Sequence, residues 1–81
     1  MQRFYFHVRS GDALTADDEG AEFPNLTAAL REAALAAREL LAEAIKSGRL
    51  DVPDAFVVAD TSGQELGSVR LAAVLPSSLN K

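Results

Sequence analysis

One long helix in the middle of the chain constrains the fold more than any other feature of the sequence. Apolar residues recur at helical spacing from Leu26 to about Ser47, which places them along one side of a helix. Asn25 is a favourable N-cap, and Pro24 keeps the residue before it out of helical geometry. Gly48 fits the left-handed position that ends many helices. The sequence therefore predicts one helix with defined ends.

The side of this helix that should face the core is rich in alanine. The predicted stripe consists of Leu26, Leu30, Ala33, Ala37, Leu40, Leu41 and Ala44. Alanine accounts for 15 of the 81 residues, so few large side chains are left to fill a core. A small domain has limited apolar surface to bury, and without disulfides or a metal it commonly gains stability by self-association. We therefore expect a homodimer.

Extended segments precede the helix. Over residues 3–9, aromatic and β-branched residues alternate with polar ones, which is typical of a strand with one buried face. A tight turn at Ser10-Gly11 predicts a hairpin, with a weaker returning strand over residues 13–16. The acidic residues 17–19 then predict a solvated turn closed by Gly20, followed by a short extended piece.

Two more strands are expected after the helix. Residues 55–59 are apolar and β-branched, residues 60–63 fit a type I turn, and residues 65–72 return as the second strand of a hairpin. The fold class predicted from this order is α+β. We expect a two-layer β-β-α-β-β domain over residues 1–75, in which one long helix packs on one face of a mostly antiparallel four-stranded sheet. Residues 76–81 are expected to be a flexible C-terminal tail.

Composition excludes several classes of protein. There is no cysteine, so disulfides and thiolate metal sites are absent. The net charge of −4 opposes nucleic-acid binding at long range. No apolar stretch reaches the ~18 residues of a membrane span, and no signal peptide is visible, so the expected location is the cytoplasm with no membrane contact.

The sequence offers no catalytic constellation. His7 is the single histidine, and neither Tyr5 nor Arg9 beside it is a natural base or orienting group for it. The acidic turn lacks the ligand spacing of a calcium loop, and no glycine belongs to a phosphate-binding motif. We expect no enzyme activity, no metal and no cofactor.

The face of the sheet that one helix cannot cover is the candidate binding surface. If the strands align as expected, this face is mixed and aromatic and suits a second copy of the chain or another protein. Basic residues there, together with Arg3, offer a route to a phosphate or carboxylate. The expected surface residues are Tyr5, His7, Arg9, Val57 and Arg70.

Two alternatives stay open. The outer side of the helix carries Ala28, Leu35 and Ala42 at seven-residue spacing, which would suit a close helix–helix contact between subunits. A small enzyme or ligand-binding domain that uses His7 with an arginine of the uncovered face is the second alternative.

The order of these features resembles a family of short bacterial proteins catalogued as a domain of unknown function. The resemblance extends from Phe4 to about Leu71 and implies a small α+β fold, with no activity attached. It is carried by Phe4, Phe6, Asp17, Gly20, Asn25, Ala29, Glu32, Ala33, Asp60 and Gly63.

A looser similarity links the chain to the HicB type of antitoxin, in which strands also precede a helix. That similarity implies a protein partner. HicB-type proteins usually add a DNA-binding segment after the domain, whereas this sequence ends at "PSSLNK", and we expect no operator binding.

Overall fold

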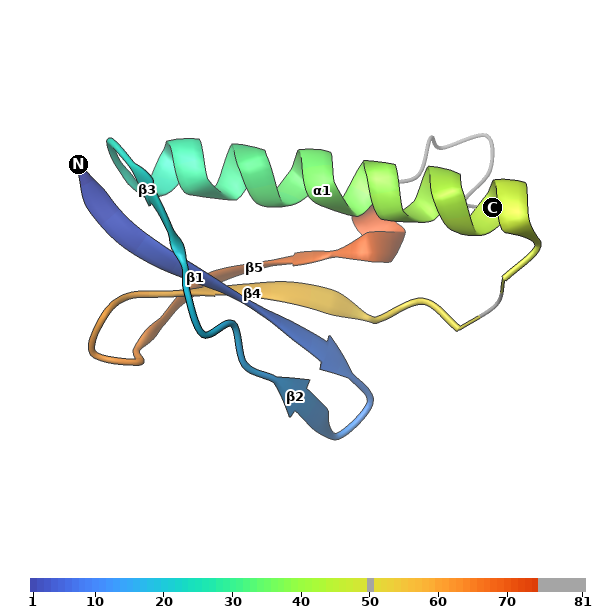
Figure 1. Ribbon diagram of the computed structural model, residues 1–81, viewed down its shortest axis with the longest axis horizontal. Helices are drawn as coiled ribbons and strands as arrows, with labels where there is room; N and C mark the ends of the chain where they lie inside the picture. The colour runs from blue at the N-terminus through green and yellow to red at the C-terminus, as the bar shows by residue number, and fades with distance from the viewer. Residues whose placement is uncertain (50, 75–81) are drawn as a thin grey trace.

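A long helix lies along one face of an antiparallel sheet (Figure 1). The structure is a computed structural model that describes residues 1–49 and 51–74. Its elements are β1 (Gln2–Ser10), β2 (Ala13–Thr15), β3 (Ala21–Phe23), α1 (Leu26–Ser47), β4 (Ala55–Ala59), β5 (Glu65–Arg70) and a 3₁₀ helix, η1 (Leu71–Val74). The predicted α+β class and the order of strands around one helix are confirmed. The tail predicted over residues 76–81 lies outside the described residues.

Within the described residues the sheet has five strands, one more than predicted. Its main path runs β2-β1-β4-β5, and β3 pairs separately with β1. The nine residues of β1 give it room for two short partners in succession, with β3 opposite its beginning and β2 opposite its end. The short extended piece predicted after the acidic turn is this extra strand.

Both ends of α1 form as the sequence predicts. The side-chain oxygen of Asn25 accepts the Ala28 N–H at 2.9 Å, which satisfies one of the first unpaired amides of the helix. Gly48 has a φ of 70°, and the N–H groups of Gly48 and Arg49 donate to the carbonyls of Ile45 and Ala44. These bonds close the last turn.

Alanines, rather than leucines, are the fully buried residues of α1. Ala29, Ala33 and Phe4 pack with Val58 in the main buried cluster, and the leucines of the predicted stripe are only half-buried. Small side chains let a helix approach a sheet closely, and on the sheet side Gly67 leaves room for the side chain of Leu30. A Cβ built there would lie 3.2 Å from Leu30 Cδ2. The larger side chains that complete this layer are Phe6, Phe23, Leu26, Phe56, Leu66 and Val69.

Two details of the predicted hairpins differ from the structure. The first turn is centred on Gly11 and Asp12, one residue later than expected, because Ser10 pairs with Ala13. Gly11 has a φ of 59°, as the first central residue of a type II′ hairpin turn requires. The last strand ends at Arg70 and gives way to η1, whereas the sequence predicted extended chain to residue 72.

Candidate functional site: the open face of the sheet

Strand register brings the expected surface residues together on the face turned away from α1. His7 lies opposite Val57, and Val57 lies opposite Ser68. Directly opposed residues of antiparallel strands point to the same side of a sheet. Since Phe4, Phe6 and Val58 pack toward the helix, the alternate residues point away from it. We call this surface the open face, and its members are Tyr5, His7 and Arg9 of β1, Ala55, Val57 and Ala59 of β4, and Glu65, Ser68 and Arg70 of β5.

The central strand of the open face is covered by its neighbours. Ala55, Val57 and Ala59 are only 0%, 3% and 1% exposed. Cross-strand side chains stand ~5 Å apart, so the longer groups on β1 shield these small residues. Val57 is therefore buried beneath the longer side chains of the open face. Ser68 and Arg70 are exposed, and Tyr5, His7 and Arg9 are half-buried.

His7 serves the fold through one of its ring nitrogens. Its Nδ1 accepts the backbone N–H of Asp17 at 3.0 Å, so the neutral ring carries its proton on Nε2 in this arrangement. The ring also stacks on Tyr5 at a centroid distance of 6.5 Å and an interplanar angle of 22°. The hydrogen bond from Asp17 holds residues 16–20 alongside the middle of β1.

Asp17 is the residue whose role the sequence did not predict. Its carboxylate accepts the Phe6 N–H at 3.1 Å and the Glu19 N–H at 3.2 Å. The bond from Phe6, above all, holds the pKa of the Asp17 carboxyl below its ordinary value, and partial burial opposes that effect. Asp18 and Glu19 are exposed as a solvated turn requires, but Asp17 is half-buried and turned toward β1.

Gly20 lets the connecting segment return to β1. Its φ is 71°, and a Cβ at this position would lie 2.8 Å from the Phe4 carbonyl oxygen and 3.0 Å from the Tyr5 ring. Only glycine combines this backbone conformation with so close an approach. The segment is thus fixed at both ends, by Asp17 and by Gly20.

Two arginines stand at one end of the open face. Arg9 and Arg70 lie on either side of Ala55 in directly opposed positions. Arg3 has partners of its own. Its guanidinium pairs with Glu22 at 3.5 Å and donates to the Glu19 carbonyl at 2.7 Å. The basic group expected from the sequence is therefore a pair.

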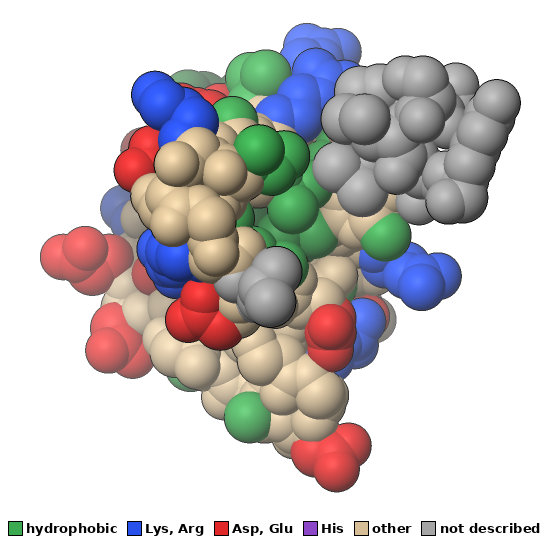
Figure 2. Space-filling model, turned by 90° about the vertical axis from the view of Figure 1, so that its right-hand side faces the viewer, with side chains coloured by type: hydrophobic (Ala, Val, Ile, Leu, Met, Phe, Trp, Pro, Cys, Tyr) green, Lys and Arg blue, Asp and Glu red, His purple; other side chains and the backbone are tan. Residues whose placement is uncertain are grey.

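A cavity of about 470 Å³ opens beside this arginine pair, at the end of the molecule where α1 terminates. Figure 2 views this end and shows hydrophobic side chains gathered at its centre, with charged groups around them. The lining residues are Arg9, Leu41, Val52, Pro53, Asp54, Arg70, Leu71 and Ala72.

The outer side of α1 offers less surface than the sequence suggested. Leu35 is 45% exposed and Ala42 is exposed, but Ala28 is half-buried. The predicted row of three residues therefore presents one leucine with an alanine on one side of it.

Residues 1–49 and 51–74 contain no group of three or more histidine, cysteine, aspartate or glutamate residues placed to hold a metal ion. Within the same ranges, no helix has the length and apolar character needed to cross a bilayer.

Comparison with known proteins identifies a family without assigning an activity. No curated protein and no solved structure matches the chain. One family model does match, and it covers residues 3–72, which run from the second residue of β1 to beyond the end of β5. The chain belongs to the family described as "Domain of unknown function (DUF6894)".

Proposed function

We propose that this protein is a non-catalytic binding module whose open face takes up a second copy of the chain. The observation that carries the proposal is the strand register, which aligns tyrosine and arginine side chains on a face that α1 does not cover. Tyrosine and arginine are enriched at protein interfaces and among the residues that contribute most to binding. Leu14, which lies opposite Arg9 and is 55% exposed, adds apolar surface to the same face.

The charges of the open face are arranged so that the face complements itself. Glu65 lies opposite Ala59 at one end of β5, and Arg70 lies opposite Ala55 at the other. If two copies stack their open faces about a two-fold axis that crosses the strands, the acidic end of one meets the basic end of the other. Two Glu65–Arg70 ion pairs would then form, with Ser68 near the axis. Such a self-complementary patch is what a two-fold dimer requires.

The role of His7 also favours binding over catalysis. A general base needs a ring nitrogen that is free to meet a substrate proton, whereas His7 Nδ1 already accepts the Asp17 N–H. The ring positions a loop and forms part of the open face.

Sedimentation velocity over a wide concentration series tests the proposal. We expect the unmodified protein to dimerise and Ser68→Glu to be monomeric, because the substitution sets two carboxylates against each other near the axis. Leu35→Glu, on the outer side of α1, is the matched control and should leave the dimer unchanged. Circular dichroism checks that each variant is folded.

A charge exchange makes the test specific to the proposed geometry. Glu65→Arg and Arg70→Glu should each weaken the dimer, and the double variant should recover it because the ion pairs re-form with reversed polarity. An unmodified protein that stays monomeric throughout the series would overturn the proposal. So would a dimer that Leu35→Glu disrupts and Ser68→Glu does not.

The similarity to HicB-type antitoxins stays a prediction. It would place a different protein on the same face, and that partner should co-purify with the chain when the two are expressed together.

A further inference from the structure

The arginine pair at the end of the open face has no carboxylate bound to it in the part of the chain that the structure describes. The ion pairs found within residues 1–49 and 51–74 join Arg3 to Glu22 and Arg49 to Asp51. Arg9 and Arg70 flank the small side chain of Ala55. Two cross-strand steps separate their Cβ atoms by ~10 Å, a span that two extended arginine side chains can close around one anion.

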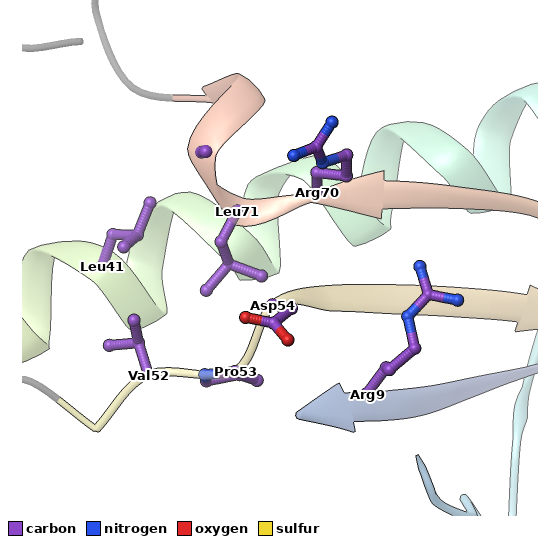
Figure 3. Close-up of a pocket in the computed structure, with 8 residues that line it drawn as sticks. Arg9, Leu41, Val52, Pro53, Asp54, Arg70 and Leu71 are labelled. Carbon is purple, nitrogen blue, oxygen red and sulfur yellow. The ribbon is translucent and has the colours of Figure 1, made fainter. Parts of the chain in front are cut away.

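The cavity beside the pair supplies an apolar wall. Leu41 of α1, Val52 and Leu71 line it, and in Figure 3 their side chains gather at one end while Arg9 and Arg70 lie toward the other. Its volume of about 470 Å³ falls within the range of pockets that bind small molecules. A ligand that fills it needs an anionic group at one end and an apolar group at the other.

Asp54 restricts the charge of that ligand. It lines the cavity between the two ends, and its Oδ2 accepts the Gly11 N–H at 2.6 Å. A carboxylate on the lining of the same cavity repels a dianion more strongly than a monoanion. The net charge of −4 acts in the same direction. A carboxylate therefore fits this site better than a phosphate.

We propose that the cavity binds a small monocarboxylate with an apolar substituent. The carboxylate accepts hydrogen bonds from the guanidinium groups of Arg9 and Arg70, a geometry that suits planar, fork-shaped donors. The substituent packs against Leu41, Val52 and Leu71. This site goes beyond the proposed self-association, although Arg70 takes part in both, so a bound carboxylate should also loosen the dimer.

A nuclear magnetic resonance titration tests the site directly. Protein labelled with ¹⁵N is diluted until sedimentation shows it to be monomeric, and sodium hexanoate is added at constant ionic strength. We expect saturable shifts of the Asp54, Ala55 and Leu71 amides. Arg9→Gln and Arg70→Gln should each weaken the affinity about tenfold or more, whereas Arg38→Gln, on the exposed side of α1, should leave it unchanged.

Two further probes decide the chemistry of the ligand. Hexanol has the same chain without the charge, and inorganic phosphate has the charge without the chain. Hexanol that saturates these amides as tightly as hexanoate would overturn the role of the arginines, and phosphate that binds more tightly than hexanoate would overturn the ligand class. Absence of any saturable shift would overturn the site itself. Because the titration uses the monomer, it can succeed even if the self-association fails.

Discussion

Replacing Asp17 with alanine should destabilise the protein more than its position in a surface turn suggests. The substitution removes the oxygens that accept the Phe6 N–H at 3.1 Å and the Glu19 N–H at 3.2 Å. Phe6 lies between the part of β1 that pairs with β3 and the part that pairs with β2. The register therefore places no residue of β2 or β3 opposite Phe6 that could take over from the carboxylate.

The size of the effect follows from those bonds. A hydrogen bond to a charged group contributes ~1.5–3 kcal/mol, and an unsatisfied buried N–H costs ~1–3 kcal/mol. Asp17 is half-buried, so solvent weakens the loss, and we expect the free energy of unfolding to fall by about 2 kcal/mol. For a domain of this size that corresponds to a melting temperature lower by roughly 8–16 °C.

Urea unfolding followed by circular dichroism measures this loss, with Asp18→Ala as the control because Asp18 is adjacent and exposed. The difference between unmodified protein and Asp17→Ala should also shrink in acid. Hydrogen bonding, mainly from Phe6, lowers the pKa of Asp17 in the folded state. Its stabilisation is therefore fully present above the unfolded-state pKa of about 3.9 and is lost as the pH falls through the lower folded-state value.

Two results would refute this reasoning. One is an Asp17→Ala variant whose unfolding free energy lies within ~0.5 kcal/mol of the Asp18→Ala variant, the scatter expected for surface substitutions. The other is a loss of stability that stays the same from about pH 7 to about pH 3, since the protonated carboxyl should bind the amides more weakly.

Two further substitutions, each paired with an internal control and measured by urea unfolding, test how the fold is held. Gly20→Ala should cost about 3 kcal/mol or more, because it combines a left-handed backbone with a collision against β1. Gly11→Ala shares the positive φ but meets no atom within 4 Å, so it should cost about 1–2 kcal/mol, and equal losses would contradict the close approach of residues 16–20 to β1. Ala33→Leu should cost ~1–3 kcal/mol by overpacking the contact between helix and sheet. Ala42→Leu, at an exposed position of the same helix, should stay within ~0.5 kcal/mol of the unmodified protein in its free energy of unfolding. An Ala33→Leu variant as stable as Ala42→Leu would mean that the contact between α1 and the sheet is not tightly packed.

Features with local causes could be predicted from the sequence. The ends of α1 depend on Asn25 and Gly48, whose capping bonds reach only three or four residues along the chain. The bounds of β4 follow from its run of apolar and β-branched residues. The alternation in β1 likewise predicts which of its side chains share the open face.

Features that depend on distant contacts could not be predicted. The bonds that join Asp17 to β1 cross 10 and 11 residues, and no periodic pattern marks them. The three residues of β3 are too few to show a period, so its pairing with β1 appears only in the structure. The burial of Val57 depends on long side chains of the neighbouring strand, and the cavity beside Arg9 is lined by residues from four separate parts of the chain.

The central claim, that the open face is the surface where this protein binds a second copy, is tested most directly by ¹⁵N chemical shifts recorded over a series of protein concentrations. Amides at an interface shift as the monomer converts to the dimer, so the spectrum itself locates the surface. The account predicts concentration-dependent shifts at Tyr5, His7, Ser68 and Arg70. Shifts confined to the outer side of α1 around Leu35, or none at any concentration, would contradict it.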